Sequence, residues 1–151
     1  MQHYDPRDRA ETFARLMQQE CLGTRVSRLH RVIARRYDQA LRPLGLSIPQ
    51  MEILGALVLL DGPARPAQLA EILLAERSTV SRNLAALQER GWVETTTTSA
   101  AGRTMAVTAT AEGAAVLTAA RDTWAALQAT AKEQLGPEAT QTLDAWLTAS
   151  A

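Results

Sequence analysis

Hydrophobic residues recur at helical spacing along most of the chain. Between residues 8 and 42 this apolar stripe changes direction near residues 20–23, from the side of Phe13 and Met17 to the side of Val26 and Ile33. The change predicts two helical stretches with a bend or break between them. Abundant Ala, scarce aromatics and long segments almost free of Gly and Pro favour a mainly helical protein.

The clearest helix start lies in the middle of the chain. Ser47 stands where an N-cap belongs, and Gln50 follows three residues later, which is the pattern of a capping box. An apolar run follows, and residues 61–63 read Asp-Gly-Pro, which ends helices. The pattern predicts a helix over residues 48–60.

Pro and Gly residues mark where the elements in the rest of the chain begin and end. Residues rich in β-formers flank the sequence SAAG and predict a hairpin. The expected elements are helices over 66–74 and 77–90, strands over 92–98 and 103–108, a long helix over 110–135, and a last helix after Gly136-Pro137.

Two short helices followed at once by a hairpin have the element order of a winged helix-turn-helix. The predicted fold class is therefore mainly α with a small β-hairpin wing, in a single domain over residues 1–151. Residues 46–109 form the winged helix-turn-helix lobe, and long helices flank it over 8–45 and 110–151. In such modules the second short helix enters the major groove of DNA.

The helix over 77–90 has one apolar side and one side suited to close contact with bases. Val80, Leu84 and Leu87 fall within one narrow arc and must face the core. The opposite arc carries hydroxyls and Arg82 near the helix start, followed by small Ala residues. An ordinary surface helix can carry the same residue types, and the adjacent hairpin is what favours a DNA-binding function.

The stretch LGLSIPQMEILGALVLLDGPARPAQLAEILLAERSTVSRNLAALQERGWVETTTTSAAGRTMAVTATAEG resembles the central pattern of the MarR family of regulators. The resemblance implies a homodimer held by the helices of residues 8–45 and 110–151. It also implies binding to double-stranded DNA at a pseudo-palindromic operator, as a repressor released by a small-molecule effector or by oxidation. The DNA-binding residues that it implies are Arg77, Ser78, Thr79, Ser81, Arg82, Asn83 and Arg103.

Composition adds limits to this interpretation. The net charge is zero, so the case for nucleic acid rests on local residues, and the wing TTTTSAAGR offers only Arg103 as a basic group. No long apolar run or signal peptide is evident, and we expect a cytoplasmic protein without membrane contact. Phosphate-binding loops and catalytic or metal-binding sets of residues are lacking, so we expect no enzyme, cofactor or metal site.

The signal that such a regulator senses has two candidate sites. The family resemblance implies an effector cleft, with candidate lining residues Arg25, Tyr37, Met51, Leu54 and Trp124, each of which is also suited to plain packing. The single cysteine, Cys21, is a candidate redox sensor, because Arg25 at i+4 could lower the pKa of its thiol. The alternative for Cys21 is a small apolar residue packed between helices.

Two further functions stay open on the sequence alone. One is a thiol-based redox regulator acting through Cys21. The other is a winged-helix module that binds only proteins. Such a module needs no cluster of hydroxyls and Arg on its exposed helix, but the near-neutral charge of this region is compatible with it. A binding titration against DNA separates the second from a regulator.

Overall fold

The computed structural model describes residues 6–97 and 105–150, and it divides into two compact units, Met1–Arg36 and Tyr37–Ala151. The first unit holds α1 (Pro6–Glu20) and most of α2 (Leu22–Leu41), and α2 continues into the second unit. The helix interruption falls at Cys21, between α1 and α2. The predicted break near residues 20–23 is therefore confirmed.

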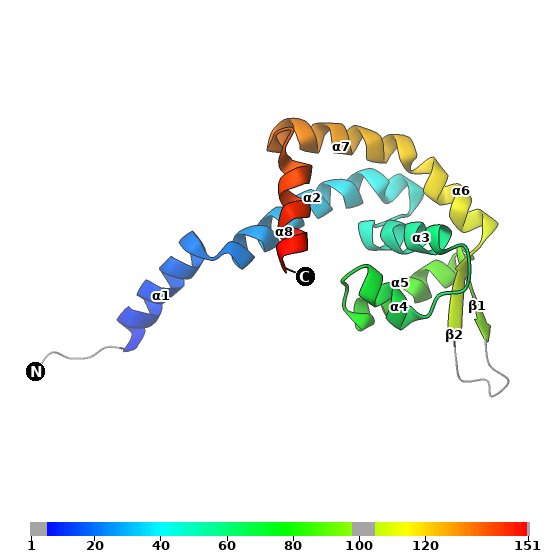
Figure 1. Ribbon diagram of the computed structural model, residues 1–151, viewed down its shortest axis with the longest axis horizontal. Coiled ribbons are helices and arrows are strands. Elements are labelled where there is room, and N and C mark those ends of the chain that lie inside the picture. The colour runs from blue at the N-terminus through cyan, green and yellow to red at the C-terminus, as the bar shows by residue number, and fades with distance from the viewer. Residues whose placement is uncertain (1–5, 98–104, 151) are drawn as a thin grey trace, which may run out of the picture. The chain divides into compact units, whose positions relative to one another are not determined.

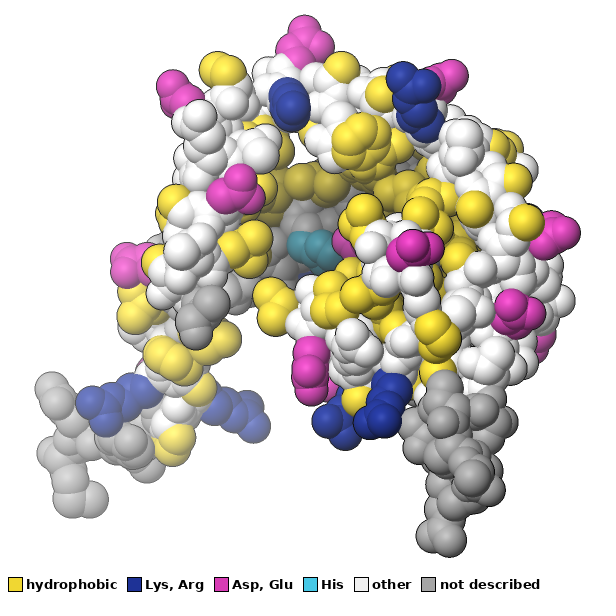
Figure 2. All heavy atoms as spheres, turned by 45° about the vertical axis from the view of Figure 1, so that its right-hand side comes forward, with side chains coloured by type: hydrophobic (Ala, Val, Ile, Leu, Met, Phe, Trp, Pro, Cys, Tyr) yellow, Lys and Arg dark blue, Asp and Glu magenta, His cyan; other side chains and the backbone are white. Residues whose placement is uncertain are grey.

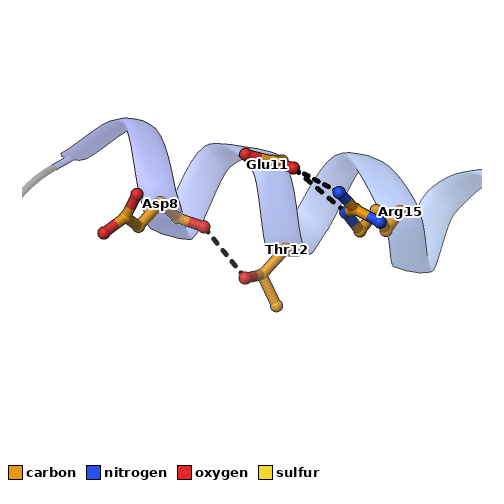
Figure 3. Close-up of polar contacts among 4 residues, drawn as sticks. All are labelled: Asp8, Glu11, Thr12 and Arg15. Carbon is orange, nitrogen blue, oxygen red and sulfur yellow. Dashed lines mark hydrogen bonds and ion pairs between the residues drawn. The ribbon is translucent and has the colours of Figure 1, made fainter.

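The polar side of α1 is stabilised by contacts within the helix itself (Figure 3). Arg15 Nε donates a hydrogen bond to Glu11 Oε1 at 3.2 Å, and Thr12 Oγ1 donates one to the carbonyl oxygen of Asp8 at 2.9 Å. An exposed ion pair at i,i+4 contributes only a few tenths of a kcal/mol. The apolar side of α1, with Phe13 61% exposed, is left without a partner among the described residues of its unit.

In the second unit, α3 (Ile48–Leu60) begins at the predicted capping box. Ser47 is the N-cap and Gln50 accepts from its backbone N–H at 3.1 Å, while the side chain of Asp38 accepts from the N–H of Ile48 at 2.9 Å. These bonds satisfy the N–H groups that a helix start leaves without partners. Asp61 ends α3 in the left-handed conformation, with φ 48°. The predicted bounds of this helix are confirmed.

The next elements form a winged helix-turn-helix (Figure 1). They are η1 (Arg42–Leu44) before α3, and then α4 (Pro66–Ile72), α5 (Arg77–Glu89), β1 (Val93–Thr97) and β2 (Met105–Ala109) after it. The two strands are antiparallel, with Thr95 opposite Val107, and Ala64 adds a single bridge to Val107. In Figure 1, α4, α5 and the hairpin lie on one side of α3, and α6 and α7 lie on the other. The fold class predicted from the sequence is confirmed.

The core of the second unit lies where α3, α4, α5 and the strands meet. α3 packs against α5, α6 and β2, and α5 packs against α4 and β1. Side chains of this size contribute about 1.5 to 3 kcal/mol each when fully buried. The largest fully buried side chains are Leu41, Ile53, Leu54, Leu69, Leu87 and Val80.

The prediction of one long helix over residues 110–135 is wrong. The structure has two helices there, α6 (Ala111–Ala119) and α7 (Arg121–Leu135), followed by α8 (Ala139–Ser150). At the break the N–H of buried Ala120 is shared between two carbonyls, those of Val116 and Leu117. Thr118 also donates its hydroxyl to the carbonyl of Ala114, a contact that bends helices. α4 also ends two residues before the predicted Leu74.

Within residues 6–97 and 105–150, no single helix is long and apolar enough to cross a membrane. One bent pair of segments, Leu22–Leu44 with Ile48–Leu60, passes on length and composition alone. In the same part of the chain, no group of three or more His, Cys, Asp or Glu side chains is placed to hold a metal ion.

Candidate nucleic-acid interface

Helix α5 separates its apolar and polar side chains cleanly. Val80, Leu84 and Leu87 are buried, with exposed fractions of 7% or less, as the helical pattern predicts. Ser78, Ser81 and Arg82 are exposed, and Thr79 and Asn83 are half-buried at the edges of this face. α5 therefore presents a narrow surface of hydroxyls and one guanidinium while its other side is fixed in the core.

Contacts within α5 give its polar side chains different degrees of freedom. The amide nitrogen of Asn83 donates to the carbonyl oxygen of Thr79 at 2.9 Å, so one of its donors is engaged inside the helix. Arg82 Nη2 lies 3.5 Å from Thr79 Oγ1, at the limit of a hydrogen bond. The Arg82 guanidinium is thus available to bind a ligand, whereas the Asn83 amide is engaged in stabilising the helix.

The start of α5 carries charge of both signs. Arg77 is the first residue of the helix, and exposed Glu76 is its N-cap without a side-chain hydrogen bond to the backbone. An acid there favours the positive end of the helix dipole but leaves the capping site of the first turn unused. The other predicted basic contact, Arg103 in the wing, lies outside the described residues.

The far end of α5 is anchored by contacts that the sequence did not reveal. Arg90 Nη1 donates to the carbonyl oxygen of Gly45 at 2.6 Å, and the same guanidinium lies 4.9 Å from the ring centroid of Trp92. Thr110 donates its hydroxyl to the carbonyl of Gly91 at 2.7 Å and caps α6 by accepting from Gly113 N. These contacts link the end of α5 to the end of η1 and to the start of α6.

A groove lies between α5 and the hairpin, next to the start of α4. Its volume is about 150 Å³. At its rim, Thr95 Oγ1 donates to Gln88 Oε1 at 3.3 Å, which ties β1 to α5. The lining residues are Pro66, Ser81, Leu84, Ala85, Gln88, Val93, Thr95, Met105 and Val107.

Of the predicted effector residues, the structure brings two together. Met51 and Trp124 line one pocket of about 280 Å³, together with Leu117, Ala120 and Arg121. Leu54 and Tyr37 are buried in the core instead, and burial raises the pKa of the Tyr37 hydroxyl. Arg25 belongs to the other unit, where its guanidinium donates to the carbonyl of Gln19. Arg121, the one charged residue among those that line this pocket, was not among the residues predicted from the sequence.

Cys21 is half-buried at the break between α1 and α2, with a free thiol. Hydrogen bonds from the side chain and backbone of Thr24 lower the pKa of this thiol, with a smaller contribution from the backbone of Gly23. The sequence had indicated Arg25 as the cause of such a shift. The structure instead places the cause in the first turn of α2, because the Arg25 guanidinium is engaged with Gln19.

Comparisons with known proteins fit this architecture. The model of one domain family, HVO_A0261 N-terminal domain, matches residues 38–132, so this part of the chain belongs to that family. No curated protein sequence matches the chain. Among solved structures, the M. tuberculosis transcriptional regulator MosR in complex with DNA is 29% identical, with a TM-score of 0.74 over 87% of this chain and 96% of that one. In sequence and fold the chain is similar to transcriptional regulators of the MarR family.

Two more distant members of the MarR family share its fold. The repressor CouR bound to a 23-mer DNA duplex is 23% identical, with a TM-score of 0.74 over 88% of this chain and 94% of that one. A mutant of MarR from E. coli complexed with operator DNA is 21% identical, with a TM-score of 0.76 over 89% of this chain and 96% of that one. These proteins are regulators rather than enzymes, and the MarR-family resemblance seen in the sequence is confirmed.

Proposed function

We propose that this protein is a sequence-specific DNA-binding transcriptional regulator that acts on DNA in the cytoplasm and has no catalytic activity. The observation that carries the proposal is α5, which holds Val80, Leu84 and Leu87 in the core and exposes Ser78, Ser81 and Arg82 beside a β-hairpin. A helix with this division is suited to the major groove, which admits one helix and offers donors and acceptors on every base pair. The DNA complexes of MosR, CouR and MarR support the same interpretation.

Each proposed contact has a distinct role. Arg82 reads a base edge, since Arg is the commonest side chain to bind guanine in the major groove. Arg77, at the helix start, contacts phosphate, and Arg103 contacts the backbone from the wing. The hydroxyl groups of Ser78, Thr79 and Ser81 complete the surface, with Asn83 at its edge.

We further propose a homodimer on a pseudo-palindromic operator, with residues 46–109 as the DNA-binding lobe and residues 8–45 and 110–151 as the dimerisation helices. Figure 2 shows hydrophobic side chains in many places on the surface of the molecule. Contiguous exposed apolar surface marks interaction sites. The residues concerned include Phe13, Leu16 and Met17 on α1, and Leu143, Trp146 and Leu147 on α8.

The regulator is proposed to be a repressor that a small-molecule effector releases from DNA. The pocket lined by Met51 and Trp124 supports this part, because it is mostly apolar with the single charged group of Arg121 at its wall. Tyr37, Leu54 and Arg25 stay candidates through the family resemblance alone, because none of them lines this pocket.

A redox-sensing function of Cys21 is a second candidate, favoured by the lowered pKa of its thiol. In that case peroxide at near-stoichiometric levels abolishes DNA binding by the unsubstituted protein, whereas the Cys21→Ser variant still binds DNA. Equal responses of the two proteins would rule out this alternative.

The experiment that tests the main proposal is selection of DNA from a random library and from genomic fragments by the full-length protein. We expect recovery of a pseudo-palindromic sequence, bound at least about a thousandfold more tightly than scrambled duplex at physiological salt. Equal affinity for all sequences, or no binding even at low salt, would favour a winged-helix module that binds only proteins.

A further inference from the structure

We propose that the groove between α5 and the hairpin reads thymine, by receiving the C5 methyl group of that base between Ser81, Ala85 and Met105. The proposal rests on the proposed DNA-binding function and adds a second, apolar element of specificity to the guanine contact assigned to Arg82. Its support comes from the shape of the groove, the exposure of Met105, and the polar groups that are already engaged around it.

The two walls of the groove are regular elements in fixed register. On α5, Ser81, Leu84, Ala85 and Gln88 share one stripe, at spacings of three and four residues. On the hairpin, the lining residues Thr95 and Val107 lie directly opposite one another, and Met105 is two residues from Val107 on the same face of β2. The groove is therefore a slot between regular elements, with α5 as one wall and the buried side chains of Leu84 and Val107 at its floor.

Met105 is an apolar side chain that the described residues leave largely uncovered. It points from the same strand face as Val107, which is 2% exposed, yet Met105 itself is 58% exposed. A flexible thioether suits a contact that forms only when a partner arrives. Ala85, across the groove, is also exposed, so a ligand can reach both side chains at once.

The position of the groove indicates which partner covers it. Ser81 is both a lining residue of the groove and a neighbour of Arg82 on the exposed face of α5. A DNA duplex that receives Arg82 in its major groove must therefore pass the mouth of this slot. The continuity of the slot with the proposed interface favours DNA over a second protein.

The chemistry of the rim selects thymine among the bases. Adenine is read by the bidentate amide of Asn or Gln. Here Gln88 Oε1 accepts from Thr95 Oγ1, and Asn83 Nδ2 donates to the carbonyl of Thr79, so in each amide one of the two atoms that a bidentate contact needs already has a partner. What the slot offers is a small apolar surface, and the C5 methyl of thymine is the apolar group among the base edges of the major groove. A volume of about 150 Å³ is ample for a methyl group and the adjoining base edge.

The test replaces each thymine of the selected operator by deoxyuridine, which removes only the methyl group, and measures the affinity of the full-length protein by fluorescence anisotropy. We expect one thymine in each half-site, next to the guanine read by Arg82, whose replacement weakens binding about fourfold, the effect of losing one buried methyl group. Replacement in both half-sites weakens binding about fifteenfold, because the two losses multiply.

Two variants assign the effect to the groove. Met105→Ala and Ala85→Ser are expected to bind the thymine and uracil operators equally, because one loses the apolar cover and the other places a hydroxyl against the methyl group. Leu59→Ala is the matched control, since Leu59 is an exposed apolar residue on α3 that does not line the groove. It should keep the parent's preference for thymine.

The outcomes separate this inference from the function on which it rests. If an operator is selected but no thymine-to-uracil change weakens binding, or if the effect persists in both groove variants, the thymine site is wrong while DNA binding stands. If no sequence is selected at all, the proposed function fails and the thymine site fails with it.

Discussion

The end of α4 offers a sharp test of the backbone geometry. The N–H of Leu74 bonds to the carbonyl of Glu71 at 3.3 Å and the N–H of Ala75 bonds to that of Ala70 at 2.9 Å, the two bonds of a Schellman motif. Its C′ residue, Leu74, has φ 50°, in the left-handed region that glycine normally occupies. α5 ends with the same motif, but there Gly91 is the C′ residue, with φ 71°.

Replacing Leu74 by glycine should therefore stabilise the protein relative to Leu74→Ala. The left-handed conformation costs a residue with a side chain about 1 to 2 kcal/mol of stability. Glycine avoids this cost but loses about 0.5 to 1 kcal/mol of stability, because its unfolded chain has more conformational entropy. The net advantage of the glycine variant over the alanine variant is then about 0.5 to 1 kcal/mol. Because Leu74 is 84% exposed, little is lost with its side chain, and Leu74→Gly should also match or exceed the parent.

The assay is urea unfolding at equilibrium, followed by circular dichroism at one fixed protein concentration, because dimerisation couples stability to concentration. Gly91→Ala is the reciprocal control: a Cβ at Gly91 would meet no atom within 4 Å, so this variant should lose about 1 kcal/mol through the backbone alone. If Leu74→Gly were less stable than Leu74→Ala, the left-handed assignment at residue 74 would be wrong.

Three further predictions concern packing, the thiol and assembly. A Cβ at Gly113 would collide with a backbone carbonyl, so Gly113→Ala should cost about 1 to 3 kcal/mol in urea unfolding, whereas Gly55→Ala, with open space around it, should not destabilise. Thr24→Val should raise the pKa of Cys21, because the threonine hydroxyl stabilises the thiolate; the pH profile of iodoacetamide alkylation should move to higher pH, and an unchanged profile would count against that hydrogen bond. Removal of residues 137–151 should abolish the dimer in sedimentation at micromolar concentration, and a truncated protein that still sediments as a dimer would exclude α8 from the interface.

Much of the fold could be predicted from the sequence because local signals mark it. Ser47 and Gln50 fix the start of α3, and Pro66 fixes that of α4, since both act on the backbone within one helical turn. The spacing of Val80, Leu84 and Leu87 identified the buried face of α5 for the same reason. The exposed polar surface followed from that face, because the remaining side chains must point away from it.

The features that sequence analysis missed depend on distant partners or on backbone geometry without a residue signature. The Arg90–Gly45 bond joins positions 45 residues apart, which no local pattern can link. The break at Ala120 falls in an Ala-rich run without Gly or Pro, where propensity alone favours a continuous helix. Leu74 carries a positive φ where the usual signal, glycine, is missing.

The substitution Arg82→Ala tests whether the exposed face of α5 reads DNA. Arg82 is exposed, so the substitution should change the free energy of unfolding by about 0.5 kcal/mol or less. A bidentate contact to guanine contributes about 1 to 3 kcal/mol, and a two-fold symmetric dimer makes it twice, so operator affinity should fall at least about tenfold. Arg103→Ala is the comparison, expected to weaken operator and scrambled DNA by similar factors if the wing contacts only phosphate.

The measurement is a fluorescence-anisotropy titration of parent and Arg82→Ala against operator and scrambled duplexes at two salt concentrations. We expect a large loss of affinity for the operator and a small loss for the scrambled duplex. An Arg82→Ala protein that is folded and dimeric and still binds the operator as tightly as the parent would contradict it.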